Sequence, residues 1–150
     1  MNMATAYKRP ESVLVVIHTL DLHVLLLERA KHPGYWQSVT GSREENESFL
    51  DTAQREVAEE TGLIVNAAQL RTWPGENIYE IMPEWRHRYD PEVTHNRERV
   101  FSLCLPDMCD IALSSTEHRA WRWSPAREAA DACFSSSNRE AILALIPGAH

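Results

Sequence analysis

The sequence lacks the features that mark membrane, secreted and nucleic-acid-binding proteins. No apolar run approaches the roughly 20 residues of a bilayer-spanning helix, and the opening MNMATAYKRPES has no apolar signal-peptide core. The three cysteines show neither C-x-x-C nor zinc-finger spacing. Basic residues number 15 against 22 acidic ones, so the charge is −7 and no basic excess favours nucleic acid or anionic membranes. We expect a cytoplasmic protein with reduced thiols, no membrane or nucleic-acid partner, and an undetermined oligomeric state.

The rest of the composition is that of one globular domain. With 150 residues, 43% of them hydrophobic, the chain has enough apolar side chains for one core and little room for a second. Apolar runs rich in β-branched residues predict strands, and helical periodicity predicts helices. The expected strands are Ser12–Thr19, His23–Arg29, Trp36–Thr40, Ile78–Met82, Arg99–Leu105 and Ala120–Trp123, and the expected helices are Ser48–Thr61, Ser124–Ala132 and Asn138–Ile146. This mixture predicts a single α/β domain over residues 1–150.

The helix expected over Ser48–Thr61 has recognisable ends. Ser48 followed by Asp51 resembles a capping box, with Asp in the usual Glu position. Gly62 suits the position just past the last turn. Pro125 is similarly expected at the first position of the helix that follows Ser124.

Three carboxylates lie in the second half of the same helix. At about 100° per residue, Glu56, Glu59 and Glu60 share one stripe beside the apolar face. Clustered carboxylates repel each other, and a hard divalent cation such as Mg²⁺ removes that repulsion. Arg55 can pair with Glu59 four residues later and hold it away from a metal. For this pattern alone, a solvated acidic face, or an acidic interaction module, is the alternative to a metal site.

The surrounding segment narrows this choice. Gly41–Leu63, GSREENESFLDTAQREVAEETGL, matches G-x5-E-x7-R-E-U-x-E-E-x-G-U, where U is a bulky aliphatic residue. This pattern is the Nudix box, and the chain resembles the Nudix hydrolase family. The resemblance implies an α/β/α sandwich with a mixed sheet. It also implies hydrolysis of a nucleoside diphosphate linked to another moiety, with Mg²⁺ (Mn²⁺ as a substitute) held by Glu56 and Glu60.

Two positions of the box concern its loop. The resemblance implies that Gly41 lets the loop approach the helix closely. Many boxes carry glycine where this sequence has Asn46. Asparagine tolerates positive φ better than most residues, so we expect the loop to keep its shape.

Motifs outside the box indicate a branch of the family. YKRPESVLVVI, WQSVTGS, RHRY, TEH and SNR together resemble the bacterial Nudix hydrolases that act on dihydroneopterin triphosphate in folate biosynthesis. The resemblance implies that Glu117 is a third metal ligand and that Glu117 or Glu59 is the general base, Glu117 being preferred. It also implies substrate contacts from Lys8, Arg29, Thr40, Tyr79, Glu80, Ile81, Met82 and Ser135.

Several alternatives stay open at this point. The chain could act on dNTPs as a nucleotide-pool pyrophosphatase, or bind a nucleotide without cleaving it, although the three box glutamates argue against the second. Lys8, Arg29, Glu80 and Glu117 could be solvated surface charges, and Ser135 a helix cap. Trp36 is more typical of a core residue than of a ring-stacking platform. His87, His118, Arg86 and Arg88 could either contact phosphate or be structural.

Overall fold

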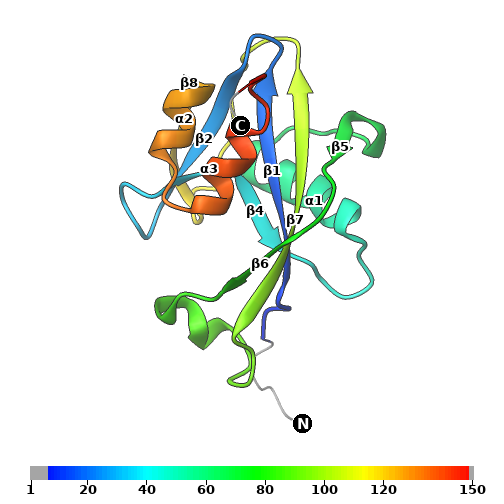
Figure 1. Cartoon of the computed structure of the whole chain (residues 1–150), viewed down its shortest axis with the longest axis vertical. Coiled ribbons are helices and arrows are strands. Elements are labelled where there is room, and N and C mark those ends of the chain that lie inside the picture. Colours follow the sequence, from blue (N-terminus) through cyan, green and yellow to red (C-terminus); the bar gives the residue numbers. More distant parts are fainter. Residues whose placement is uncertain (1–6, 149–150) are drawn as a thin grey trace.

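The computed structural model describes residues 7–148, which form an eight-stranded mixed sheet with helices on both faces (Figure 1). The strands are β1 (Glu11–Thr19), β2 (His23–Arg29), β3 (Trp36–Gln37), β4 (Val39–Ser42), β5 (Leu70–Thr72), β6 (Asn77–Glu80), β7 (His95–Leu105) and β8 (His118–Pro125). The helices are α1 (Phe49–Thr61), α2 (Ala126–Ala132) and α3 (Ser136–Leu143), with 3-10 helices η1 (Ala67–Gln69) and η2 (Pro83–Arg88). Within residues 7–148, no helix has both the length and the apolar character needed to cross a membrane.

The sheet is built around β1. This strand pairs in parallel with β7 along its whole length, from Glu11 opposite Arg97 to Thr19 opposite Leu105. On its other side β1 pairs antiparallel with β4 along its first half and with β2 near its end. β5 and β6 pair antiparallel with β7, and β3 and β8 pair antiparallel with β2. The mixed sheet implied by the family resemblance is confirmed.

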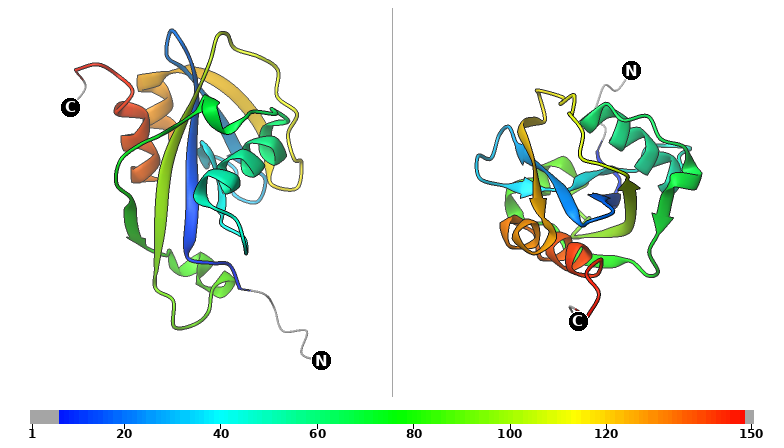
Figure 2. Two further views of the ribbon diagram at one scale, coloured as in Figure 1. Left: turned by 90° about the vertical axis from the view of Figure 1, so that its right-hand side faces the viewer. Right: turned by 90° about the horizontal axis from the view of Figure 1, so that it is seen from above.

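Two hydrophobic cores hold the helices against opposite faces of this sheet (Figure 2). Because side chains alternate along a strand, Val13, Val15 and Ile17 of β1 point to the core that contains Ala53 and Val57 of α1. Val16 faces the other core, which α2 and α3 cover. The predicted three-layer arrangement is therefore correct.

The ends of α1 follow the sequence prediction. The hydroxyl of Ser48 accepts a hydrogen bond from the backbone N–H of Asp51 at 3.0 Å, and the Asp51 carboxylate accepts one from the N–H of Ser48. Gly62 has φ of +78°, the left-handed conformation that glycine adopts readily. Both caps satisfy backbone groups that a helix end otherwise leaves unpaired.

The structure corrects several predicted boundaries. The strand predicted over Trp36–Thr40 is two strands, and the second, β4, continues through Gly41 because its ladder with β1 uses backbone atoms alone. Pro125 is the N-cap of α2 rather than its first residue. α3 begins at Ser136, because Ser135 caps it by accepting a hydrogen bond from the N–H of Asn138. β5, η1 and η2 were not predicted.

Candidate active site

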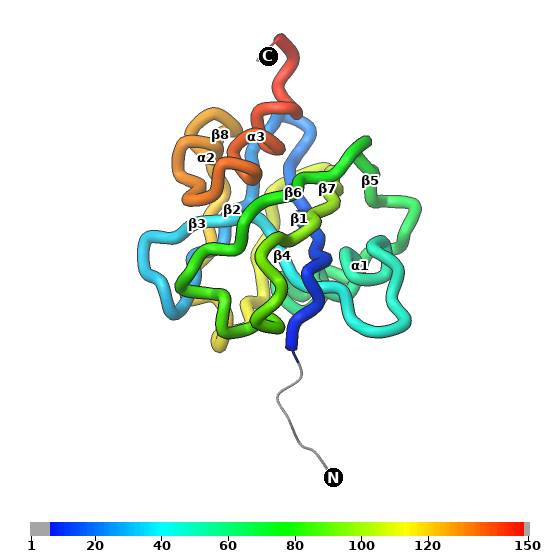
Figure 3. Tube along the Cα trace, turned by 60° about the horizontal axis from the view of Figure 1, so that its bottom comes forward, coloured from blue at the N-terminus to red at the C-terminus, as the bar shows by residue number. Residues whose placement is uncertain are grey.

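A cleft of about 1460 Å³ opens on the side of the sheet formed by β4, β1, β6 and β7. Its other walls are α1, the start of α3, η2 and the segment before β1. Figure 3 shows this end of the molecule, where the start of the described chain runs beside β4 and the segment from β6 into η2. The cleft is lined by nearly all of the predicted site residues, namely Lys8, Arg29, Thr40, Glu56, Glu59, Tyr79, Glu80, Ile81, Met82, Glu117 and Ser135. Segments far apart in the sequence thus meet at one site.

Gly41 sets how closely α1 approaches the sheet at this point. A Cβ atom placed on Gly41 would overlap the carboxylate of Glu56, its nearest neighbour. The absence of a side chain therefore leaves the space that the Glu56 carboxylate occupies. The close approach expected for Gly41 is present in the structure.

Glu60 is a buried carboxylate. The residue is 1% exposed, and within residues 7–148 neither of its side-chain oxygens has a hydrogen-bond partner, Nδ1 of His118 being 3.9 Å from Oε1. Burial raises the pKa of Glu60 well above its usual value, and the nearby carboxylates of Glu56 and Glu117 raise it further. Such a group is costly to bury unless a cation compensates it.

Glu117 and His118 lie beside Glu60. One ligand atom from each of these three residues lies within 4.8 Å of the others. Burial, with the positive charge of Arg29 nearby, lowers the pKa of His118 to about 4, so its imidazole is neutral at pH 7. Nε2 of the ring accepts a hydrogen bond from the side-chain amide N–H of Gln37 at 3.1 Å. His118 therefore brings no positive charge to balance Glu60.

These carboxylates fit a divalent cation. Glu56, Glu60 and Glu117 supply oxygen atoms, which are the ligands that hard cations such as Mg²⁺ prefer. The two unpartnered oxygens of Glu60 are the direct evidence, because an ion would provide the compensation that the protein does not. Among the three box glutamates, Glu56 and Glu60 are buried, whereas the side chain of Glu59 is 52% exposed.

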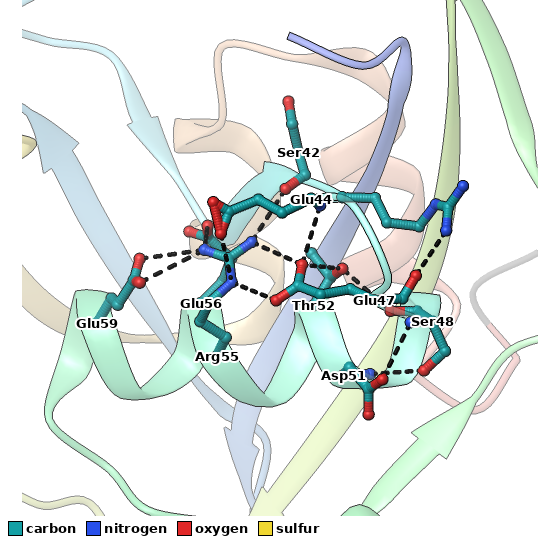
Figure 4. A network of polar contacts seen from close by, with 10 residues as sticks. Ser42, Glu44, Glu47, Ser48, Asp51, Thr52, Arg55, Glu56 and Glu59 are labelled. Atoms are coloured by element: carbon teal, nitrogen blue, oxygen red, sulfur yellow. Dashed lines mark hydrogen bonds and ion pairs between the residues drawn. The ribbon is translucent and has the colours of Figure 1, made fainter. Parts of the chain in front are cut away.

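Arg55 ties the box loop to α1 (Figure 4). Its guanidinium donates to both oxygens of Glu47, at 2.6 and 3.0 Å, and to Glu56 at 2.6 Å. The predicted pair with Glu59 is present but longer, at 3.3 Å. A further bond, of 3.1 Å, reaches the carbonyl of Ser42 at the end of β4. Arg55 therefore positions Glu56 and links it to the sheet and the loop.

The loop conformation allows this network. Asn46 has φ of +68°, the left-handed conformation that the sequence predicts it to tolerate. The next residue, Glu47, then reaches Arg55 and also accepts a hydrogen bond from the hydroxyl of Thr52 at 2.9 Å. The Asn at this position leaves the loop intact.

Replacing Glu47 with glutamine should destabilise the protein at neutral pH and matter less in acid. The Arg55 guanidinium beside it lowers the pKa of Glu47 from 4.5 to about 2. A carboxylate with a pKa depressed by folding contributes stability that is full above pH 4.5 and is lost as pH falls towards 2. We expect the variant to lose about 2 kcal/mol of unfolding free energy at neutral pH.

Urea denaturation of the wild type and the variant at several pH values would measure this difference. Glu45→Gln is the matched control, since Glu45 is exposed in the same loop. A gap between wild type and Glu47→Gln that stays constant down to the pKa of Glu47 would contradict the prediction.

A wall of positive charge faces the carboxylates. Burial lowers the pKa values of both Lys8 and Arg29, and the charge of Arg88 lowers them further, which places the three groups close together. The backbone N–H of Lys8 donates to the carbonyl of Arg88 at 2.9 Å, joining the segment before β1 to η2. The guanidinium of Arg29 lies 5.1 Å from the centre of the Trp85 ring. Clustered cations of this kind suit a polyphosphate.

Two of the predicted substrate-binding residues, Thr40 and Ser135, also make hydrogen bonds within the fold. The hydroxyl of Thr40 donates to the carbonyl of Val13 at 2.9 Å, and Ser135 caps α3. β6 ends at Glu80, so Ile81 and Met82 follow the strand rather than belong to it. Ile81 is buried, whereas Tyr79, Glu80 and Met82 are exposed at the cleft.

The structure shows which of the residues with two open interpretations line the cleft and which do not. Trp36 packs in the core under the guanidinium of Arg122, away from the cleft, as the structural interpretation predicts. Arg88 and His118 line the cleft, whereas Arg86 and His87 do not.

Trp85, Phe134 and Glu98 are among the cleft residues that sequence reasoning did not identify. Trp85 and Phe134 meet edge to face, with ring centres 5.8 Å apart. Glu98 is 4% exposed and projects from β7 into the same space. In the sequence Glu98 stands between Arg97 and Arg99, a pattern typical of exposed charged residues. The one sequence feature that could have indicated its position is that Asn96 and Glu98, two residues apart in a strand, share a face.

Comparisons with known proteins agree with this geometry. A model of the NUDIX domain matches residues 8–145. The chain is 47% identical over 139 residues to dihydroneopterin triphosphate diphosphatase of Escherichia coli K12, covering 91% of both proteins. It is 40% identical to the Haemophilus influenzae protein of that name, covering 91% of this chain and 87% of that protein.

A solved structure supports the fold independently. The E. coli dihydroneopterin triphosphate pyrophosphohydrolase superposes with a TM-score of 0.87 at 44% sequence identity, covering 94% of this chain and 97% of the other. The chain belongs to the Nudix family, whose members generally use divalent metal ions, and it is a Nudix hydrolase.

Proposed function

We propose that the protein hydrolyses dihydroneopterin triphosphate to dihydroneopterin monophosphate and pyrophosphate, as a cytoplasmic enzyme of folate biosynthesis. The observation that carries this proposal is the cleft itself, in which a carboxylate cluster faces the cationic wall of Lys8, Arg29 and Arg88. The full-length similarity to enzymes named for this substrate supports the choice of pterin.

Glu56, Glu60 and Glu117 would hold Mg²⁺, or Mn²⁺ in its place. The bound ion would neutralise phosphate charge and position the attacking water. Lys8 and Arg29 bind the phosphate oxygens and offset the repulsion between a triphosphate and the carboxylate cluster. Water adds to phosphorus as the anhydride bond between the α- and β-phosphates breaks, so that pyrophosphate leaves.

We assign proton removal from the water to Glu117. Burial raises the pKa of Glu117, as do the charges of Glu56 and Glu59, while Lys8 and Arg29 oppose the shift. Glu117 lies beside Glu60 and lines the cleft, so it is within reach of a water molecule next to a bound ion. Glu59, the alternative base, is instead held by Arg55 at 3.3 Å.

The test is a substrate panel with product analysis. With Mg²⁺, the purified protein should release pyrophosphate, not single phosphate, from dihydroneopterin triphosphate, and with a higher kcat/KM than from any dNTP. A higher kcat/KM for a canonical or oxidised dNTP would favour the nucleotide-pool pyrophosphatase instead. Binding without turnover of any triphosphate would indicate a sensor.

A further inference from the structure

Glu98 is a buried carboxylate that the proposed chemistry does not use. It lies on β7 with its side chain on the face turned towards α3, and it lines the cleft although it is only 4% exposed. One oxygen accepts a hydrogen bond from the amide of Asn77 at 3.1 Å. Burial raises the pKa of Glu98, and hydrogen bonds from Asn77 and Ser137 oppose the shift.

Glu98 has no cationic partner among residues 7–148. The flanking Arg97 and Arg99 point to the opposite face of β7, where both pair with Glu76 at 3.0 and 3.7 Å. No charged group contributes to the pKa shift of Glu98. A buried carboxylate without a cation is costly, so donors from a ligand in the cleft would stabilise it.

The position of Glu98 separates it from the phosphate end of the cleft. Ser12 of β1 pairs with Ser42 of β4 on one side and with Glu98 on the other. Glu98 is therefore two strand spacings, or roughly 10 Å, from Ser42. Arg55 binds the carbonyl of Ser42 and the carboxylate of Glu56, which places Ser42 at the phosphate end. This separation would let a ligand with its phosphates at that end place its ring at Glu98.

The surroundings of Glu98 suit a flat heterocycle. Leu14 is two residues from Ser12, the β1 partner of Glu98, and the pKa of Tyr79 is raised in part by the charge of Glu98, so both cleft residues lie near Glu98 and offer apolar surface. Burial, with the charge of Glu98, raises the pKa of Tyr79 to about 12, so its hydroxyl stays protonated and accepts a hydrogen bond from Asn96 at 3.0 Å. The subsite therefore combines apolar walls with one carboxylate.

We propose that Glu98 is the ring-recognition residue, binding the donor edge formed by the 2-amino group and the adjacent ring N–H of the pterin. Two neighbouring N–H donors that point the same way match the two oxygens of a carboxylate. Guanine presents the same edge, hypoxanthine lacks the amino group, and adenine has no ring N–H beside an amino group. This inference rests on the proposed function and narrows the substrate class to 2-amino-oxo ring systems.

A purely structural role for Glu98 makes a different prediction. Ser137 lies in the first turn of α3, so a structural role for Glu98 would be to hold the start of that helix through its hydrogen bond from Ser137. Loss of that contact alone would lower stability and affect all substrates equally. If Glu98 recognises the ring, its loss instead weakens the binding of substrates that have the 2-amino group beside a ring N–H more than the binding of those that lack it.

The experiment compares Glu98→Gln with wild type on dihydroneopterin triphosphate in Mg²⁺. Because one charged hydrogen-bond pair is lost, we expect KM to rise about 10- to 100-fold with a small change in kcat. Binding of GTP and ITP is measured calorimetrically without divalent cations. Wild type should bind GTP about 10-fold more tightly than ITP, whereas Glu98→Gln should bind the two nucleotides with about the same affinity. Glu98→Asp, which keeps the charge, should retain part of the GTP preference.

Glu128→Gln is the matched control, because Glu128 is exposed on α2 and outside the cleft. An unchanged KM together with an unchanged GTP-to-ITP ratio in Glu98→Gln would overturn the inference, as would an equal loss for both nucleotides. If wild type leaves dihydroneopterin triphosphate intact, the proposed function fails, whereas the GTP-to-ITP ratio still decides the role of Glu98.

Discussion

Glu60→Gln should remove most turnover while leaving the protein folded and no less stable without metal. Glutamine has nearly the same shape but no charge, and neither oxygen of Glu60 has a hydrogen bond to lose within the part of the chain that the structure describes. Removing the charge also ends the repulsion from Glu56 and Glu117, which the raised pKa of Glu60 reflects. We expect kcat/KM to fall by at least about 10²-fold, since stabilisation of several kcal/mol depends on a correctly held ion.

Thermal melts with and without Mg²⁺ separate this prediction from simple damage. An ion that binds only the folded state, and is present at a concentration 100 times its Kd, stabilises that state by about 2.7 kcal/mol. Wild type should therefore melt several degrees higher in Mg²⁺, whereas Glu60→Gln should show little or no shift. Glu128→Gln should behave as wild type. A Mg²⁺-induced shift in Glu60→Gln equal to that of wild type would show that the ion binds elsewhere.

Features set by local sequence were predictable, and the helix that carries the box is the clearest case. Its caps at Ser48 and Gly62 depend on residues within a few positions of each other, and so does the side of the helix that Glu56 and Glu60 share. β2 was predicted with its observed ends for the same reason, because its apolar run is bounded by turn residues. Periodicity and capping are short-range properties.

Features that depend on register between distant strands were not predictable from local patterns. Glu98 faces the cleft only because β7 lies parallel to β1 and pairs with β6, which aligns Ser12, Glu98 and Asn77 in one row. A one-residue shift would turn Glu98 to the face that Arg97 and Arg99 occupy. β5 was missed because three residues carry too little pattern to identify a strand.

The Arg55 network shows the same limit inside the box. The sequence suggested Glu59 as the partner of Arg55, since the two stand four residues apart on one helix. The shorter bonds go to Glu47, in the loop, and to Glu56, the next residue on α1. The bond to Glu47 depends on the loop, in which Asn46 has a positive φ, and helical spacing cannot predict a partner that lies outside the helix. The bond to Glu56 joins adjacent residues, whereas the i, i+4 rule considers only residues one turn apart.

Gly41→Ala is expected to lower kcat/KM by at least about 10²-fold, although it adds only a methyl group. The new Cβ would overlap the Glu56 carboxylate, so either β4 or Glu56 must move. Gly41 pairs with Val13 inside the sheet, which resists movement of the backbone. The displaced group is therefore expected to be Glu56, with a stability cost of about 1–3 kcal/mol from overpacking. Steady-state kinetics would measure the loss of activity, and urea denaturation would measure the loss of stability.

Gly75→Ala provides the contrast for this substitution. Gly75 has φ of +80° with no atom within 4 Å of an added Cβ, so alanine there costs about 1 kcal/mol of backbone strain and contacts nothing. Its kinetics should match wild type even if its stability falls as far as that of Gly41→Ala. Equal kinetic losses in the two variants would attribute the effect to general destabilisation.

A double-mutant cycle shows whether Gly41 acts through Glu56. If the methyl group works by displacing that carboxylate, adding Gly41→Ala to Glu56→Gln should cost little further activity, because the displaced ligand is already disabled. Losses that multiply would mean that the methyl group disturbs something else, such as the bond from Arg55 to the Ser42 carbonyl one residue away. The coupling between a glycine in β4 and a glutamate in α1 would thus be measured as a free energy.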